Sequence, residues 1–352
     1  MKVLIAAGSS GGHIYPAIAA AFKIKELSPG AEIFFLGSKK GLDIKILKNE
    51  GYRFDTISAD RSIFRDLISV FMILRRFRPD VVVGFGGYVS FPALVLAKTM
   101  GVSTFIHEQN LIPGMANKVL SGISDAVGVS FKETKKYFLR KSRIRETGNP
   151  VRASLVRLNK NEALRRLDLD EQRFTIFVMG GSQGAHFIND AVIDTLKNMS
   201  GAERGYYQFI HLSGAKDFDF VKSSYESLNV KSRVFSFCDS MSGIYSAADL
   251  IISRAGASSI AEITFFGLPS ILVPYPSAKV HQLENAKFLG DREAAIVVDQ
   301  RSLSAGYLKQ IMVSLLRDRQ RLKLMAANAA GLSVPDAANR LAREIIDNAA
   351  KG

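Results

Sequence analysis

The sequence predicts an α/β protein with two Rossmann-like domains, each built on a doubly wound parallel sheet. Short apolar strand patterns alternate with helical stretches along nearly the whole chain, which is typical of parallel βαβ architecture. The alternation stops near residues 148–152 and then starts again. Each half opens with a glycine-rich turn after its first strand, and 352 residues suffice for two domains of ordinary size.

The first half contains five apolar strand patterns that we expect to form one sheet. A helix should run from about Pro16 to Leu27, and a second helical stretch covers Ser62–Phe77. The expected strands are residues 2–8, 32–36, 81–84, 104–107 and 126–129.

The second half repeats this alternation and then ends in helices alone, from about residues 303, 321 and 335. We therefore expect one domain at residues 1–157, a second at 158–334, and a last helix in 335–352 that packs back on the first domain. The strands expected in the second half are residues 174–179, 208–212, 233–237, 250–252, 270–273 and 295–298.

The chain is strongly basic, with a formal net charge of +14 and a pI near 9.8. Such a charge requires an acidic partner: nucleic acid, anionic lipid or a phosphorylated substrate. The sequence has no Trp and no RNP-like or zinc-finger pattern, so specific nucleic-acid recognition lacks support. The single cysteine, Cys238, excludes a disulfide framework and agrees with a reducing compartment. No stretch resembles a signal peptide or a membrane span, so we expect a cytoplasmic protein.

One helical stretch, Ser62–Phe77, combines apolar residues around most of its circumference with several arginines. Burial between a sheet and other helices would explain the apolar residues but not the arginines. A helix that lies on an anionic bilayer explains both, and each nearby basic residue adds about 1 kcal/mol of attraction. The residues expected to meet the membrane are Ile63, Phe64, Leu67, Phe71, Leu74, Arg61, Arg65, Arg75 and Arg76.

The two glycine-rich turns, Gly8–Gly12 and Gly180–Gly184, do not have the GxGxxG spacing of dinucleotide sites. The second strand also lacks a terminal acidic residue, so a dehydrogenase is disfavoured. The backbone N–H groups of such turns can bind phosphate, although glycine turns with a purely structural role are about as common.

A third turn, Arg254–Ser259, joins the strand at residues 250–252 to a helix that should end at Gly267. The helix N-terminus could bind a phosphate, and Glu262 one turn later could accept hydrogen bonds from two ribose hydroxyls. Ser259 and Glu262 also have the spacing of a capping box, which needs no ligand. This segment by itself leaves both interpretations open.

Polar residues follow several of the expected strands. His13 starts the first helix, whereas Tyr88 and Glu108 follow the strands at 81–84 and 104–107, so all three should lie at the carboxyl edge of the first sheet.

In the second half, His281, Gln282 and Asn285 lie on one side of an expected helix and could bind sugar hydroxyls, although a solvated helix face has the same pattern. We interpret Asp217 and Asp219 as helix-capping residues rather than metal ligands.

Seven motifs together resemble the MurG family, the bacterial UDP-N-acetylglucosamine transferases of peptidoglycan synthesis. In chain order they are GSSGGHIYPAIA, GFGGYVSFP, HEQNLIPGMANK, TGNPVR, GGSQGAHFIN, SRAGASSIAEI and HQLEN. The resemblance implies the GT-B fold, in which two Rossmann-like domains face each other across a cleft. It also implies transfer of N-acetylglucosamine from UDP-N-acetylglucosamine to the muramyl 4-hydroxyl of lipid I, giving lipid II. The resemblance further implies that the protein works at the cytoplasmic face of the bacterial inner membrane.

The resemblance also implies the residues of each substrate site. Those expected around the donor are Ser10, Gly11, Asn110, Arg152, Ser182, Phe237, Cys238, Ala257, Ser258, Ser259, Glu262, His281 and Gln282. Those expected around the acceptor are Gly12, His13 and Tyr88, with Ser10 and Glu108 beside them.

The implied mechanism is a single displacement with inversion, which needs a base for the acceptor hydroxyl. We expect His13 to be this base, with Glu108 as the rival. Arg152 and the helix that follows Gly256 can stabilise the departing UDP, so we expect neither a metal nor another cofactor. Two other functions stay open: a UDP-N-acetylglucosamine 2-epimerase, which shares the fold, and a basic nucleic-acid-binding protein.

Overall fold

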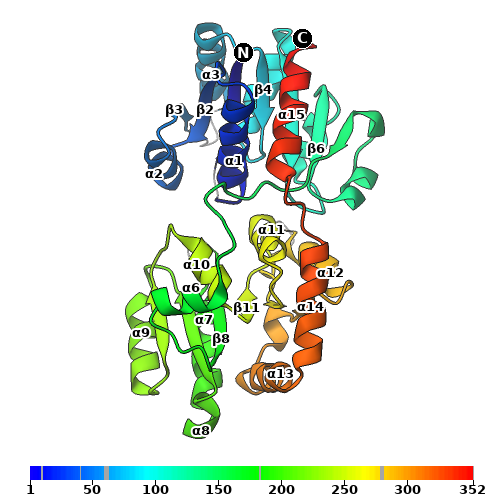
Figure 1. The fold of residues 1–352 in the computed structure, drawn as a ribbon. Coiled ribbons are helices and arrows are strands. Elements are labelled where there is room, and N and C mark those ends of the chain that lie inside the picture. Colours follow the sequence, from blue (N-terminus) through cyan, green and yellow to red (C-terminus); the bar gives the residue numbers. More distant parts are fainter. Residues whose placement is uncertain (9–10, 40, 59–62, 182–183, 278–280, 352) are drawn as a thin grey trace. The chain divides into compact units, whose positions relative to one another are not determined.

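The computed structural model describes residues 1–8, 11–39, 41–58, 63–181, 184–277 and 281–351 of the chain (Figure 1). The chain divides into two compact units. Unit 1 comprises Met1–Ala153 and Val334–Gly352, and unit 2 comprises Ser154–Ser333. The division falls slightly before residue 157, where the sequence places it.

Unit 1 contains a parallel sheet with the strand order β3-β2-β1-β4-β5-β6-β7. Its strands are β1 (Lys2–Ala6), β2 (Glu32–Ser38), β3 (Arg53–Ile57), β4 (Val81–Gly84), β5 (Ser103–Glu108), β6 (Ala126–Val129) and β7 (Ile144–Glu146). The central strands read as apolar runs because helices cover both faces of the sheet. The edge strands β3 and β7 are missing from the sequence-based expectation, since both mix polar with apolar residues and β7 has only three residues.

The helices of unit 1 come from both ends of the chain. They are α1 (Gly11–Leu27), α2 (Gly41–Asn49), α3 (Ile63–Phe77), α4 (Ser90–Thr99), α5 (Met115–Leu120) and α15 (Ala337–Ala349), with 3-10 turns η1 (Lys132–Tyr137) and η2 (Lys141–Arg143). The expected start of the first helix at Pro16 is wrong, because α1 begins at Gly11 and contains Pro16 in its interior. This earlier start places His13 within the first turn of α1.

Two hydrophobic cores cover the two faces of the unit 1 sheet. One contains Ile14 of α1 and Leu341 of α15 together with the central strands. The other contains Val70 of α3, Leu94 of α4 and Leu120 of α5. The C-terminal helix α15, red in Figure 1, lies beside α1, so the last residues of the chain complete the unit that the first residues begin.

Unit 2 contains a parallel sheet with the strand order β10-β9-β8-β11-β12-β13. Its strands are β8 (Phe174–Met179), β9 (Tyr207–Leu212), β10 (Ser232–Phe235), β11 (Leu250–Ser253), β12 (Ser270–Leu272) and β13 (Ala295–Val297). Its helices are α6 (Lys160–Arg166), α7 (His186–Lys197), α8 (Gly201–Arg204), α9 (Phe218–Ser227), α10 (Met241–Ala247), α11 (Ala257–Phe266), α12 (Gln282–Gly290), α13 (Ala305–Arg317) and α14 (Arg319–Gly331), with the 3-10 turn η3 (Gln300–Ser302).

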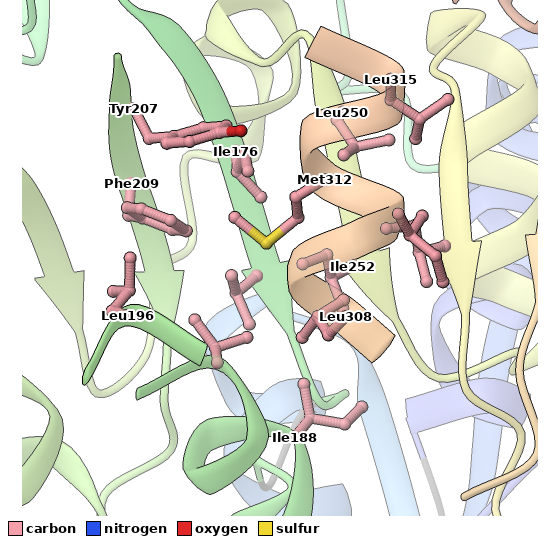
Figure 2. Packing of buried hydrophobic residues seen from close by; sticks show 14 of the residues in the cluster. Ile176, Ile188, Leu196, Tyr207, Phe209, Leu250, Ile252, Leu308, Met312 and Leu315 are labelled. Atoms are coloured by element: carbon pink, nitrogen blue, oxygen red, sulfur yellow. The ribbon is translucent and has the colours of Figure 1, made fainter. Parts of the chain in front are cut away.

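The core of unit 2 joins its strands to the helix α13. Figure 2 shows Met312 of α13 near Ile176 of β8 and Leu308 of α13 near Ile252 of β11, and all four side chains are fully buried. Burial of a side chain of this size contributes about 1.5–3 kcal/mol. This packing holds in place the two strands whose carboxyl ends carry the candidate site.

The predicted fold class is confirmed: both sheets are parallel and doubly wound. Each strand expected from the sequence is present, with ends that differ by at most two residues. Among the described helices, none has the length and apolarity needed to cross a bilayer.

Candidate functional site

In each unit the strand order changes direction beside the first strand, which is where open α/β sheets bind ligands. This point lies between β1 and β4 in unit 1, and between β8 and β11 in unit 2. The glycine-rich turns at Gly8 and Gly180 follow β1 and β8, whereas Gly86 and Gly256 follow β4 and β11. The chain therefore has two candidate half-sites, one in each unit.

The half-site of unit 1 is organised by hydrogen bonds between three side chains. The Nδ1 atom of His13 lies 3.1 Å from Oε1 of Gln109. The Nε2 atom of Gln109 donates to the carbonyl oxygen of Phe85 at 3.0 Å and lies 3.1 Å from Nδ1 of His107. Nε2 of His107 in turn lies 3.0 Å from the carbonyl oxygen of Gly148. These contacts connect α1, β5 and the segment after β7 in one buried network.

Burial lowers the pKa of His107 from 6.5 to about 4, with a smaller contribution from the charge of His13. The hydrogen bond to Gly148 acts in the opposite direction but does not outweigh burial. His107 is therefore neutral at physiological pH. It carries its proton on Nε2, which faces a carbonyl oxygen, and it accepts from Gln109 at Nδ1.

Glu108 is buried, and both of its carboxylate oxygens are engaged. Oε1 accepts from the backbone N–H and the side-chain amide of Asn110, at 2.9 and 3.1 Å. Oε2 accepts from the backbone N–H of Gly114 at 3.0 Å and from Nδ2 of Asn117 at 2.8 Å. With 1 % of its surface exposed and four donors on its oxygens, this carboxylate shapes the loop after β5. The structure thus disfavours Glu108 as the rival base.

Gly86 and Gly87 leave the space that the ring of His13 occupies. A Cβ on Gly86 would lie 3.1 Å from Cε1 of His13, and both glycines have positive φ. Ser90 holds the same turn, because its hydroxyl accepts from the Gly86 N–H and shares its single proton between the carbonyl oxygens of Gly86 and Ala6, at 2.8 and 3.0 Å. Tyr88 lies in the same turn.

The other predicted site residues that belong to unit 1, some expected at the donor and some at the acceptor, are distributed as follows. Tyr88 packs partly against the core under α3 and α4. Gly11 is buried and Gly12 is exposed at the start of α1. The guanidinium of Arg152 lies 4.7 Å from the ring centroid of Tyr15, which is also on α1. Ser10 lies outside the described residues.

In unit 2, the helix α11 begins at Ala257, earlier than a capping box at Ser259 and Glu262 requires. Its N-cap residue is Gly256, which contributes no side-chain hydrogen bond. Ser259 and Glu262 are interior helix residues, so the capping-box interpretation is wrong. Ala257, Ser258 and Ser259 form the first turn of α11, where the helix dipole is positive.

Glu262 contacts Tyr245, which no sequence motif indicates as a site residue. Its Oε2 accepts a 2.7 Å hydrogen bond from the hydroxyl of Tyr245, and only 9 % of Glu262 is exposed. Tyr245 on α10 is buried, with its ring stacked on Phe266 at 4.8 Å and edge-on to Phe177 at 5.3 Å. Hydrophobic packing thus fixes the hydroxyl that orients the carboxylate.

Arg254 places a buried positive charge two residues before the N-cap of α11. Its Nη1 donates to the carbonyl oxygens of Val273 and Pro274, at 3.0 and 3.3 Å, and its guanidinium lies 5.4 Å from the ring centroid of Tyr275. Burial lowers the pKa of Arg254, but an arginine remains charged. A buried cation next to a helix N-terminus favours an anionic ligand.

The helix α12 supports the turn before α11. Oε1 of Gln282 accepts from the backbone N–H groups of Tyr275 and Ala255, at 3.0 and 3.3 Å. Nδ2 of Asn285 donates to the carbonyl oxygen of Ala255, and Asn285 is fully buried. Asn285 therefore supports this turn from the interior and does not lie on a solvated helix face. His281 is partly exposed at the N-cap of α12 with a positive φ of 51°.

Phe237 and Cys238 follow β10, and 42 % of Phe237 is exposed. Ser182 lies outside the described residues. Asp217 occupies the N-cap position of α9 but makes no side-chain capping hydrogen bond, because its carboxylate pairs with His186 and accepts from Asn189, at 3.1 and 2.7 Å.

The exposed face of α3 differs in part from the face that the sequence predicts to meet a membrane. Leu74 is 1 % exposed and belongs to the core, and Leu67 is only partly exposed. Ile68 and Met72, absent from the prediction, are 60 % and 59 % exposed. The exposed apolar residues of α3 are Ile63, Phe64, Ile68, Phe71 and Met72, accompanied by exposed Arg65, Arg75 and Arg76, while Arg61 lies outside the described residues.

Two Rossmann-like units, each with a candidate half-site at its strand ends, are typical of nucleotide-sugar glycosyltransferases, and the comparisons agree with this class. Residues 3–129 match the glycosyltransferase family 28 N-terminal domain, and residues 175–341 match its C-terminal domain. The chain is 35% identical, over 100% of both chains, to the UDP-N-acetylglucosamine–N-acetylmuramyl-(pentapeptide) pyrophosphoryl-undecaprenol N-acetylglucosamine transferase of Acetivibrio thermocellus. The chain belongs to this transferase family, known as MurG.

Solved structures agree with this assignment. The crystal structure of Acinetobacter baumannii MurG is similar, with a TM-score of 0.78 and 27% identity, covering 98% of this chain and 99% of that one. A UDP-N-acetylglucosamine 2-epimerase from Neisseria meningitidis has a TM-score of 0.70 and 14% identity, with full coverage of both chains. At that identity the epimerase shares the fold alone.

Proposed function

We propose that the chain transfers N-acetylglucosamine from UDP-N-acetylglucosamine to the muramyl 4-hydroxyl of lipid I, with inversion, to form lipid II. The observation that carries this proposal is the full-length similarity to a transferase whose name specifies both substrates. The two half-sites support it, since each lies at the strand ends where this fold binds ligands.

Unit 2 is proposed to bind the donor. The first turn of α11 and the nearby charge of Arg254 suit a diphosphate. Glu262 suits the ribose: a carboxylate has about four acceptor positions, so the bond from Tyr245 is compatible with two ribose hydroxyls. Phe237 lies after β10, where an exposed aromatic ring can cover a uracil.

Unit 1 is proposed to bind the acceptor and to supply the base. His13 is partly exposed at the start of α1, and Nδ1 of its ring faces Gln109. The 4-hydroxyl of the acceptor gives its proton to His13 while its oxygen forms the bond to the sugar C1. The bond between C1 and the UDP oxygen breaks, and its electron pair stays on the diphosphate. Arg254, the α11 dipole and Arg152 offset this negative charge.

The exposed face of α3 is proposed to bind an anionic membrane from the cytoplasmic side. Phe64, Ile68 and Met72 recur every four residues and therefore form one stripe along the helix. Arg65 and Arg75 are exposed on the same helix and can contact lipid phosphates. Such attachment would bring the acceptor site to a lipid-linked substrate.

The direct test is transfer of labelled N-acetylglucosamine from UDP-N-acetylglucosamine to a lipid I analogue. We expect a labelled disaccharide product that requires the acceptor. In His13→Ala, turnover should fall by about 100-fold or more while the donor Kd stays near wild type. A folded protein that binds the donor but transfers nothing would contradict the proposal.

A second experiment tests the donor site itself. Glu262→Gln should raise the Kd for UDP-N-acetylglucosamine by about 10-fold or more, since hydrogen bonds to a charged group contribute about 1.5–3 kcal/mol. Tyr245→Phe should raise it less, because it removes only the bond that orients Glu262. Glu226→Gln on the exposed surface of α9 is the matched control. If Glu262→Gln binds the donor like wild type, Glu262 has only a structural role.

A 2-epimerase would convert UDP-N-acetylglucosamine without any acceptor. Analysis of the nucleotide-sugar products with and without the lipid I analogue separates the two reactions. Tight, salt-sensitive binding of duplex DNA without donor binding would instead favour the nucleic-acid alternative.

A further inference from the structure

We infer that Gln109 is a positioning residue that determines which ring nitrogen of His13 acts as the base, and that this nitrogen is Nε2. The role of His13 as the base rests on the proposed function, whereas the tautomer of His13 follows from the hydrogen bonds alone.

The carbonyl oxygen of Gly148 can only accept a hydrogen bond. Nε2 of His107 lies 3.0 Å from it and therefore carries the ring proton. Nδ1 of the neutral His107 then has a lone pair, and the amide group 3.1 Å away must turn its nitrogen toward it. This orients the side chain of Gln109.

Two further carbonyl oxygens enforce the same orientation of Gln109. Its Nε2 lies 3.0 Å from the carbonyl oxygen of Phe85 and 3.2 Å from that of His107. The reverse amide orientation would bring Oε1 against both oxygens and against the lone pair of His107. Since Gln109 is 1 % exposed, water does not offset such repulsion.

With its nitrogen directed inward, Gln109 presents only Oε1 to His13. An oxygen 3.1 Å from Nδ1 requires a proton on that nitrogen. The neutral ring of His13 then has its lone pair on Nε2. The proton of the acceptor hydroxyl therefore goes to Nε2. It does not pass through Gln109, whose oxygen already accepts from the ring.

The turn confines the ring of His13, and the hydrogen bond to Gln109 makes a ring flip costly. A Cβ on Gly86 would lie 3.1 and 3.2 Å from Cε1 and Nδ1 of His13, so the backbone of the turn is close to this edge of the ring. After a flip, a carbon atom would face Oε1 of Gln109 and the hydrogen bond would be lost. The turn and Gln109 thus determine one ring orientation together.

The test is 15N NMR of the full-length protein labelled at its five histidines, with the His13 signals assigned from their loss in His13→Asn. The neutral form of the wild-type ring should show a protonated Nδ1 and a bare Nε2. Gln109→Leu should abolish this preference and lower kcat by about 10- to 100-fold, with the donor Kd unchanged. Gln109→Glu keeps an acceptor oxygen opposite Nδ1, and its second oxygen must carry a proton to donate to the carbonyl oxygen of Phe85. As this neutral acid it should keep the wild-type tautomer and recover part of the turnover.

Gln208→Leu is the matched control, because Gln208 is an equally buried amide with three hydrogen bonds in unit 2. It should lower stability without changing the His13 tautomer. A proton on Nε2 of wild-type His13, or an unchanged tautomer in Gln109→Leu, would overturn the inference. If Gln109→Leu does not fold, the wild-type and Gln109→Glu spectra decide. A protonated Nδ1 in a protein that transfers nothing to lipid I would refute the proposed function and leave the inference intact.

Discussion

Mild acid should destabilise each unit through one buried histidine. Burial lowers the pKa of His107 in unit 1 to about 4 and that of His211 in unit 2 to about 3, from 6.5 in both cases. Below pH 6.5 the unfolded chain therefore binds protons that the folded chain does not. The contribution of these two histidines to the free energy of unfolding is fully present above pH 6.5. It is lost as the pH falls toward the folded-state pKa.

The size of the effect follows from these values. At pH 5 both folded-state pKa values lie below the pH, so the loss depends on the unfolded state alone and is about 2 kcal/mol for each unit. For His107 the loss levels off near 3 kcal/mol below pH 4. Between pH 5 and 7, ordinary carboxylates stay ionised in both states and contribute little to the slope.

The assay is urea unfolding at pH 7.5 and pH 5, with pulse-labelling hydrogen exchange and mass spectrometry to read each unit separately. His107→Gln should reduce the pH-dependent loss in unit 1 by about 2 kcal/mol and leave that of unit 2 unchanged, which makes unit 2 an internal control. NMR titration of the His107 ring gives a direct second measurement. The reasoning is refuted if the ring titrates near pH 6.5, or if unit 1 of the variant keeps the full loss.

Two further predictions concern packing and the membrane. Gly184→Ala should destabilise unit 2 by about 3 kcal/mol or more, because φ is +79° and the new Cβ would lie 2.1 Å from the Ser213 carbonyl oxygen. Gly201→Ala, with no atom within 4 Å of the new Cβ, should change unfolding midpoints little. Phe64→Asp, at a position 78 % exposed on α3, should weaken binding to anionic vesicles about 10-fold. Phe22→Asp, 49 % exposed on α1 at the other face of the sheet, should bind vesicles like wild type, and equal losses in both variants would refute the α3 surface.

Much of the fold could be predicted because buried parallel strands have a strong local signature. Strands such as β4 and β8 are continuous apolar runs, and the structure places them where the sequence predicts. The edge strands β3 and β7 lack this signature, since each has a neighbour on one side only and mixes polar with apolar residues. Helix starts were less predictable: Pro16 suggests a beginning, yet α1 starts at Gly11.

The candidate site could likewise be predicted from the sequence only in part. Glycine-rich turns and polar residues after strands could be located from the chain, because strand ends converge at one edge of a sheet. The pairing of Glu262 with Tyr245 could not, since these residues lie on different helices and meet through packing on Phe266. The same holds for Leu74, whose burial depends on how α3 rotates against the sheet.

The sequence by itself determined the two-unit α/β fold, the family and the segments that carry chemistry, because periodicity and motifs are local properties of the chain. Only the tertiary structure decided the roles within those segments. Glu108 and Gln109 are neighbours in one motif, but the first is saturated by four donors while the second orients His13. Some polar atoms are fully hydrogen-bonded within the fold, whereas others can contact a ligand. The difference depends on partners that are distant in sequence, and burial makes the loss of such hydrogen bonds costly.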